Sequence, residues 1–327
     1  MRGPETPEPA AKPDHGGGID AAAARFGGRR DDWVDLSTGI NPRHYPVPAL
    51  SADAWAALPD EAAQQGLVAA ARAFWRVPET AAVLAAPGAS ALIALMPLLA
   101  AAGRVRIAQP TYNEHGRAFR ACSWQVVEGA GEAEAQVLVH PNNPDGRLWT
   151  AVEDAPLTVL DESFCDVTPE ASLVQLASRP GVVVLKSFGK FWGLAGLRLG
   201  FALGDPGLIG RLAAMLGPWP VSGPALAIGT AALRDPAWAQ ATRVRLAADA
   251  ARLDRMLCAR GAGLAGGTSL FRLYDVADAG RWQAALAQHH IWTRVFPYSA
   301  RWLRLGLPGS PDGWTRLETA LQEVPEP

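Results

Sequence analysis

The chain has 327 residues, of which 49% are hydrophobic and 19% charged, with a formal net charge of −2 and a pI near 6.3. This length can bury the core of one large domain and a smaller one. The balanced charge excludes the basic footprint of nucleic-acid-binding proteins. No apolar run is long enough to span a bilayer, and Cys122, Cys165 and Cys258 are too scattered for a zinc site or a redox pair. We therefore expect a cytoplasmic protein without nucleic-acid, membrane or metal partners.

Four segments are predicted along the chain. Residues 1–14, rich in Pro and Ala, are expected to form a flexible tail. Residues 15–50 hold no long periodic element, and we expect them to pack across an active-site mouth or join the smaller domain. Residues 51–225 are predicted to form the large domain and residues 226–327 the small one.

The large domain is predicted from short apolar runs that alternate with helical stretches such as 88–103 and 113–122. The runs are rich in Val, Leu and Ile without clean alternation, which is typical of strands buried on both faces. The predicted strands are 81–87, 104–110, 124–129, 135–141, 157–161, 181–188 and 197–203. The sequence therefore predicts an α/β fold with a mostly parallel seven-stranded sheet sandwiched by helices. Ligands bind such sheets at the carboxyl ends of the strands.

The pattern of predicted helices and strands changes after about residue 205. A long amphipathic helix is predicted over 236–261, and a shorter one over 280–290. Strands are predicted over 267–276, 291–297 and 301–308. This combination is typical of a smaller α+β domain.

Polar residues gather where the predicted strands end. Asn142, Asn143 and Gly146 follow one strand in a turn, Asp161 and Glu162 end the next, and Ser187, Lys190 and Arg198 surround the last two. A buried carboxylate is costly unless it is paired, which marks Asp161, whereas Glu162 is interpreted as a solvated strand end.

Lysine is rare in this chain, whose positive charge is otherwise arginine. The lysines are Lys12, Lys186 and Lys190, and two of them lie four residues apart in "LKSFGKFWGLAGLRLG". A nucleotide-binding P-loop is excluded there, because Val184 stands where glycine is needed and Phe191 where Ser or Thr is needed. Pyridoxal phosphate, in contrast, needs a lysine for a Schiff base, an acid for its ring nitrogen and a phosphate cradle. Lys190 suits that role, and Lys186 is interpreted as a strand-end charge.

The motifs "PNNPDG", "LDESF", "SFGKFWGLAGLRLG" and "RWLRLGL" occur in that order between residues 88 and 307. In these motifs the chain resembles the fold-type I pyridoxal-phosphate enzymes of the class I/II aminotransferase superfamily. The resemblance implies that Lys190 is the catalytic Schiff-base lysine, Asp161 the partner of the ring nitrogen and Asn143 the donor to the ring oxygen. It also implies a phosphate cradle of Ala89, Ser90, Ser187 and Arg198, with Tyr112 over the ring.

Two positions depart from the superfamily pattern. Phe164 replaces a common tyrosine three residues after Asp161, and Leu58 replaces a tyrosine that commonly reaches the partner subunit's cofactor phosphate. The resemblance still implies a homodimer, but Leu58 lacks the phenol that would make this cross-subunit contact.

The N-terminal stretches "HGGG" and "DLSTGINP" bear on the substrate. An esterase oxyanion loop is excluded, because the chain has no G-x-S-x-G elbow. The two stretches, together with Phe164, resemble the L-threonine-O-3-phosphate decarboxylase family of cobalamin biosynthesis. That resemblance implies a phosphorylated amino-acid substrate, released as (R)-1-amino-2-propanol O-2-phosphate after loss of CO2. The substrate residues that it implies are His15, Gly16, Gly39, Ile40, Asn143, Arg294 and Arg304.

The cofactor residues alone do not decide the reaction. An aminotransferase acting on histidinol phosphate or another amino acid would share all of them. A non-catalytic binding protein on the same fold is a further alternative, although the retained lysine argues against it.

Overall fold

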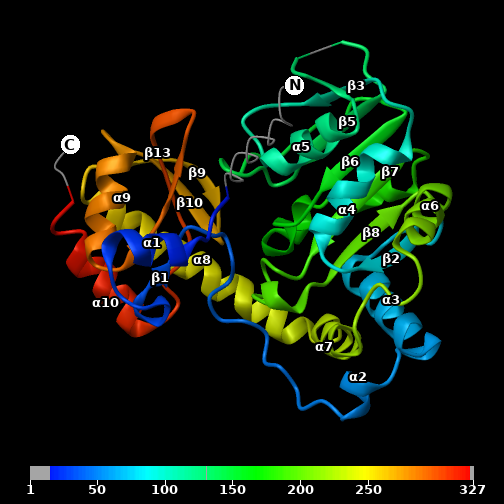
Figure 1. The fold of residues 1–327 in the computed structure, drawn as a ribbon, viewed down its shortest axis with the longest axis horizontal. Helices are drawn as coiled ribbons and strands as arrows, with labels where there is room; N and C mark the ends of the chain where they lie inside the picture. The colour runs from blue at the N-terminus through cyan, green and yellow to red at the C-terminus, as the bar shows by residue number, and fades with distance from the viewer. Residues whose placement is uncertain (1–14, 130, 325–327) are drawn as a thin grey trace, which may run out of the picture.

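A computed structural model describes residues 15–129 and 131–324 and shows a large lobe and a small lobe, with a long helix running between them (Figure 1). The tail predicted over residues 1–14 lies outside the described residues. Within the described part of the chain, no helix is both long and apolar enough to cross a bilayer.

The large lobe is built on a seven-stranded sheet in the order β2-β8-β7-β6-β5-β3-β4. The strands are β2 (Ala82–Ala86), β3 (Arg104–Ile107), β4 (Gln125–Val127), β5 (Ala135–Val139), β6 (Leu157–Asp161), β7 (Val182–Ser187) and β8 (Gly200–Gly204). Strand β8 runs antiparallel to β2 and β7, while the other neighbours are parallel. All residues of β5, β6 and β8 are buried, as their mostly apolar sequences predict. The predicted fold class is confirmed.

Helices cover both faces of this sheet (Figure 1). They are α2 (Asp53–Ala56), α3 (Glu61–Trp75), α4 (Ala89–Leu95), α5 (Asn113–Ala121), α6 (Pro206–Leu216) and α7 (Gly223–Leu233). On β7, Val183 and Leu185 join the core shared with α4, α5 and α6. Val182 and Val184 point the other way, into a core shared with α3 and α7. The strand alternation thus places one apolar layer on each face.

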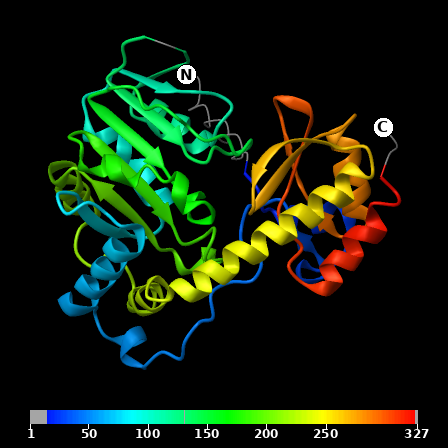
Figure 2. The ribbon, with the colours of Figure 1, turned by 180° about the vertical axis from the view of Figure 1, so that it is seen from behind.

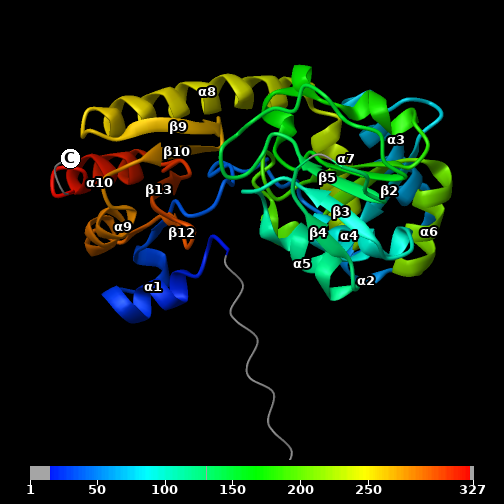
Figure 3. The same ribbon diagram turned by 90° about the horizontal axis from the view of Figure 1, so that it is seen from above.

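The small lobe is an antiparallel sheet in the order β12-β13-β10-β9. Its strands are β9 (Gly263–Thr268), β10 (Phe271–Asp275), β12 (Arg294–Phe296) and β13 (Ser299–Leu305), and its helices are α9 (Ala279–Gln288) and α10 (Pro311–Ala320). Helix α8 (Pro236–Cys258) runs from the large lobe along the back of this sheet (Figures 2 and 3). The side chain of Asp235 caps α8 by accepting a hydrogen bond from the Trp238 amide at 2.9 Å.

Residues 15–50 contain a helix that the sequence analysis missed, α1 (Ile19–Phe26). Its eight residues are too few to show a strong period, and it is held by packing, with Ile19 and Ala22 in a cluster with Trp33 and Ala287. Strand β1 (Val34–Asp35) then pairs in parallel with β11 (Ile291–Trp292) of the small lobe. The first part of the segment therefore packs with the small lobe, whereas the Asn41 and Tyr45 amides donate to the Lys190 and Trp192 carbonyls of the large lobe.

The two lobes touch where the turn after β5 meets the edge strand β9. The Gly267 amide donates to the Asp145 carbonyl at 2.7 Å. A Cβ added to Gly146 would lie 2.0 Å from the Gly267 carbonyl oxygen, so only glycine permits this approach. The contact brings the small lobe against the carboxyl ends of the large sheet, where the candidate site lies.

Candidate active site

Two adjoining cavities lie at the carboxyl ends of β5, β6 and β7. The outer one, of about 600 Å³, opens between the lobes. The inner one lies deeper in the large lobe. Tyr112, Asn143, Phe164 and Lys190 line both, so these four residues form the passage between them.

The inner cavity collects every residue predicted to bind the cofactor. Its lining includes Ala89, Ser90, Tyr112, Asn143, Asp161, Ser187, Lys190 and Arg198, which are spread over the sequence between residues 89 and 198. Strand ends β6 and β7 supply Asp161 and Ser187, and the start of α4 supplies Ala89 and Ser90. Their assembly in one cavity is what the predicted roles require, and the roles themselves stay predictions.

Asp161 is 2% exposed and is held by three hydrogen bonds. His115 Nε2 lies 2.8 Å from Oδ2, and Ser163 donates its amide at 3.0 Å and its hydroxyl at 2.5 Å to Oδ1. Burial alone would raise the pKa of this carboxyl, but the His115 and Ser163 bonds outweigh burial and lower it. The carboxylate is therefore kept charged at the base of the inner cavity.

Sequence reasoning missed His115 and Ser163. His115 is fully buried on α5, three residues after Tyr112 and four before the buried Phe119. That helical spacing was the available signal, because it places a histidine on the apolar face, where a polar side chain needs a partner.

Lys190 is buried near two arginines, and these surroundings favour its neutral form. Burial and the nearby Arg304 lower the pKa of the Lys190 amine to about 8, with Asp161 opposing the change and Arg198 adding to it. Its Nζ lies 5.3 Å from the centre of the Phe164 ring. The neutral, nucleophilic form of the amine is consequently far more populated near neutral pH than at the ordinary lysine pKa.

Arg198 packs directly on Gly88 at the entrance to α4. A Cβ on Gly88 would lie 2.5 Å from the Arg198 guanidinium, and Gly88 has a φ of 86°. The glycine thus leaves room for a cation at the first turn of α4, as an anion-binding cradle requires.

Arg304 lies buried at the rear of the outer cavity. Its Nη2 donates to the Ser37 carbonyl at 2.8 Å, and its Nη1 contacts Asn143 Oδ1. Its Nε is buried without a hydrogen-bond partner among the described residues. Burial, followed by the neighbouring Arg294, lowers the pKa of the Arg304 guanidinium to about 10.

Arg294 stands directly opposite Arg304, because the two are cross-strand partners in the β12–β13 pairing. Both line the outer cavity. Like charges in this position are destabilising by themselves. The pair therefore favours an anionic ligand between them.

The N-terminal residues reach the same cavity. His15, Gly16 and Gly39 line it, whereas Ile40 is partly buried and does not. His15 Nε2 lies 3.2 Å from Glu114 Oε1, and the His15 carbonyl accepts a hydrogen bond from Arg294 at 3.1 Å. The Gly17 amide donates to Ser37 Oγ at 2.6 Å, so this amide is already bonded within the protein.

Gly39 is required by the two aromatic rings beside it. A Cβ at this position would come within 2.8 Å of Phe271 and 2.9 Å of Phe164. The Phe164 and Phe271 rings meet edge-to-face, with centroids 5.0 Å apart. Phe164, the departure from the superfamily tyrosine, thus packs between the N-terminal segment and the cavity passage.

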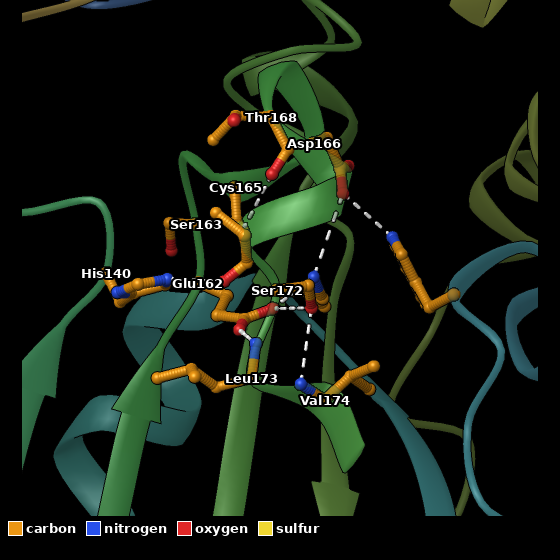
Figure 4. A network of polar contacts seen from close by, with 12 residues as sticks. His140, Glu162, Ser163, Cys165, Asp166, Thr168, Ser172, Leu173 and Val174 are labelled. Carbon is orange, nitrogen blue, oxygen red and sulfur yellow. Dashed lines mark hydrogen bonds and ion pairs between the residues drawn. The ribbon is translucent and has the colours of Figure 1, made fainter. Parts of the chain in front are cut away.

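Two interpretations from the sequence were wrong, and the two residues concerned form an ion pair with each other. Glu162 is not a solvated strand end and Lys186 is not a strand-end charge, because they are 1% and 2% exposed and pair at 2.5 Å. Figure 4 shows the surroundings of Glu162, which also accepts hydrogen bonds from Ser172 Oγ and the Leu173 amide. Glu162 and nearby Asp166 raise the pKa of the Lys186 amine, although burial acts to lower it.

His140, Glu162 and Cys165 lie close enough to hold a metal ion, with donor atoms within 4.8 Å of one another. Each already has protein partners, however. His140 Nε2 lies 2.7 Å from the Ala171 carbonyl, and its Nδ1 accepts the Trp149 amide at 3.0 Å. The cluster is a hydrogen-bonded support for the β6 end (Figure 4).

Comparison with known proteins agrees with this architecture. The family profile "Aminotransferase class I and II" matches residues 41–321. The chain therefore belongs to the class I and II aminotransferase family. A solved histidinol-phosphate aminotransferase from Sinorhizobium meliloti, in complex with pyridoxal-5'-phosphate, superposes with a TM-score of 0.75 at 19% identity, covering 94% of each chain.

Two curated relatives are more similar in sequence. A threonine-phosphate decarboxylase from Pseudomonas aeruginosa is 41% identical, and the match covers 96% of this chain and 98% of the relative. A threonine-phosphate decarboxylase from a Sinorhizobium species is 40% identical over 95% and 98% of the two chains.

Proposed function

We propose that this protein is a pyridoxal-phosphate-dependent carboxy-lyase that decarboxylates L-threonine O-3-phosphate. The product is (R)-1-amino-2-propanol O-2-phosphate, a building block for cobalamin biosynthesis. The two relatives with 41% and 40% identity carry that activity in their names.

The cross-strand pair of Arg294 and Arg304 is the observation that carries the substrate class. Two guanidinium groups face one cavity, and one of them keeps a buried Nε without a partner in the described chain. A substrate with both a carboxylate and a phosphate would offset the repulsion between them. Arg304 is the candidate for the carboxylate, because its Nη1 contacts Asn143 at the cavity passage.

The inner cavity fits pyridoxal phosphate in the chemistry of its donors. Lys190 would form the covalent link, Arg198, Ser187 and the first turn of α4 would hold the phosphate, and Asp161 would face the ring nitrogen. When bound, the cofactor supplies an electron sink for the electrons left by the departing CO2.

The protein's own groups set the conditions for that chemistry. Asp161 stays ionised because its hydrogen bonds lower its pKa, so it can hold a proton on a partner nitrogen. Burial, followed by Asp161 and Glu114, raises the pKa of the Tyr112 phenol to about 12, so this group stays protonated. Lys190, with a pKa of about 8, can accept or return a proton at Nζ near neutral pH.

Product analysis tests the reaction. Purified protein with pyridoxal phosphate and L-threonine O-3-phosphate should release CO2 and the amino-alcohol phosphate. Transamination is the alternative reaction to test, because the fold is shared with a histidinol-phosphate aminotransferase. Formation of a 2-oxoacid, with glutamate produced from added 2-oxoglutarate and no CO2 from the substrate, would overturn the decarboxylase assignment.

We also propose a cytoplasmic homodimer. Large apolar side chains stand exposed around the start of α3 and α7, with Trp55 at 71%, Leu58 at 66% and Trp219 at 52% exposure. An exposed apolar surface of this kind favours a protein partner. Cys122, Cys165 and Cys258 are all free thiols, in keeping with a reducing compartment. Sedimentation analysis should give twice the chain mass, and Trp55→Lys should shift it toward the monomer.

A further inference from the structure

Asn41 is a buried amide outside the two cavities, and its contacts lead to the catalytic lysine. It is 1% exposed and belongs to residues 35–45, which we call the strap. The strap leaves the small lobe after β1 and passes Ser37, whose carbonyl holds Arg304. It then reaches residues 188–193, which we call the lysine turn.

The strap binds three consecutive carbonyl groups of the lysine turn. The backbone N–H of Asn41 donates to the Lys190 carbonyl at 3.0 Å. Its side-chain Nδ2 donates to the Phe191 carbonyl at 2.8 Å, and the Tyr45 backbone donates to the Trp192 carbonyl at 2.9 Å. Asn41 thus holds the carbonyl of Lys190 itself and that of the next residue.

Arg245 of α8 fixes the orientation of the Asn41 side chain. Its Nη2 donates to Asn41 Oδ1 at 2.9 Å, and the Arg43 backbone donates to the same oxygen at 3.1 Å. With Oδ1 occupied by two donors, Nδ2 must face the Phe191 carbonyl. Helix α8, which spans both lobes, therefore contacts the carbonyl-binding amide of the strap through Arg245.

The opposite side of the turn is held separately. The Trp192 indole donates to Asp166 Oδ2 at 3.1 Å and is stacked between Phe188 and Trp238, with interplanar angles of 10° and 12°. Gly193 fits because a Cβ there would lie 2.7 Å from the Asn41 carbonyl oxygen. Asp166, Phe188 and Trp238 of α8 thus anchor the Trp192 side chain, whereas the strap anchors the backbone at Lys190.

We propose that Asn41 is a positioning residue for Lys190, and that Arg245 acts through it. By holding two carbonyl groups of the lysine turn, Asn41 fixes the direction in which the Lys190 side chain enters the cavity passage. The inference rests on the proposed function only where it takes Lys190 as the group that captures the cofactor. A misplacement of the reacting atom of about 1 Å can slow a reaction on the order of 100-fold.

Capture of the cofactor by the apoprotein tests this directly. The rate at which pyridoxal phosphate becomes attached to Lys190 is followed by visible absorbance and confirmed by borohydride reduction and peptide mapping. Asn41→Ala should slow capture roughly 10- to 100-fold. Arg245→Met should slow it less, Arg245→Lys should restore most of the rate, and the double variant should be no slower than Asn41→Ala alone.

Amide hydrogen exchange over residues 188–193, measured without cofactor, supplies a second readout. Exchange should rise in Asn41→Ala and Arg245→Met. It should stay unchanged in Arg252→Met, a matched control on the same helix whose guanidinium lies over Trp314 in the small lobe. If Asn41→Ala does not fold, the Arg245 pair decides the question.

Wild-type rates of capture and exchange in these variants would overturn the inference, as would additive effects in the double variant. A wild-type chain that captures the cofactor without decarboxylating threonine phosphate would overturn the substrate assignment alone. A wild-type chain that takes up no cofactor would overturn the proposed function, while the exchange comparison would still decide the role of Asn41.

Discussion

Lys186 and Lys190 lie four residues apart at the end of the same strand, and their surroundings act on them in opposite directions. Lys186 faces Glu162 and Asp166 in the interior, and these carboxylates raise its pKa. Lys190 faces the cavity passage near Arg304 and Arg198, and burial with these cations lowers its pKa to about 8. The comparison teaches that burial alone does not determine the state of an amine, because the sign of the neighbouring charges decides between a permanent cation and a nucleophile.

The largest expected effect comes from removing the nucleophile. Lys190→Ala should lower turnover by roughly 1000-fold or more, because no other described lysine reaches the cavities. Steady-state CO2 release measures the loss. Borohydride should then leave no cofactor on the peptide around residue 190, and normal labelling elsewhere with normal turnover would contradict the assignment.

Removing the other lysine should damage stability instead of chemistry. Lys186→Met leaves Glu162 and Asp166 buried without their cation, and breaking such a pair costs about 3–5 kcal/mol of unfolding free energy. Urea denaturation of the apoprotein measures this loss. The double variant Lys186→Met/Glu162→Gln should recover part of it, whereas equal losses in both variants would mean that the charge pairing is unimportant.

The arginine pair offers a case where function and stability oppose each other. Arg294→Gln should raise KM for threonine phosphate roughly 10- to 100-fold, since it removes a charge-assisted contact. It should also slightly raise the melting temperature of the apoprotein, because it relieves the repulsion with Arg304. An unchanged KM would place the substrate phosphate elsewhere, and His15→Ala would then be the next variant to measure.

The smallest effect is a difference in pH dependence between the two lysines. Lys190 has a folded-state pKa below its unfolded value of 10.5, so folding costs free energy below pH 8 and less as the pH rises from 8 to 10.5. Lys190→Met should therefore stabilise the apoprotein most below pH 8. Because the folded pKa of Lys186 is raised, its contribution is complete below about pH 10 and is lost only as the pH rises through its folded pKa. Denaturation midpoints from pH 7 to 10 measure both.

Sequence reasoning predicted the sheet well because its apolar runs are local signals of buried strands. The residues predicted to bind the cofactor came from the resemblance of the motifs to the superfamily; the structure gathers them in one cavity, and their roles stay predictions. The missed features depend on partners distant in sequence. The ion pair of Glu162 with Lys186 joins residues 24 apart, and Asn41 donates to Phe191 150 residues away. Helix α1 was missed because its stability comes from packing on Trp33 and Ala287, not from its own period.

The glycine contact between the lobes has a consequence for the behaviour of partly opened molecules. Strand β9 is an edge strand whose outer side is unpaired in its sheet, and exposed edges are templates for pairing with other chains. Its end at Gly266 and Gly267 is covered by Asp145 and Gly146 of the large lobe. Separation of the lobes would therefore expose this end of the unpaired edge of β9 to other chains. We expect the turn after β5 to protect the protein against aggregation in this way.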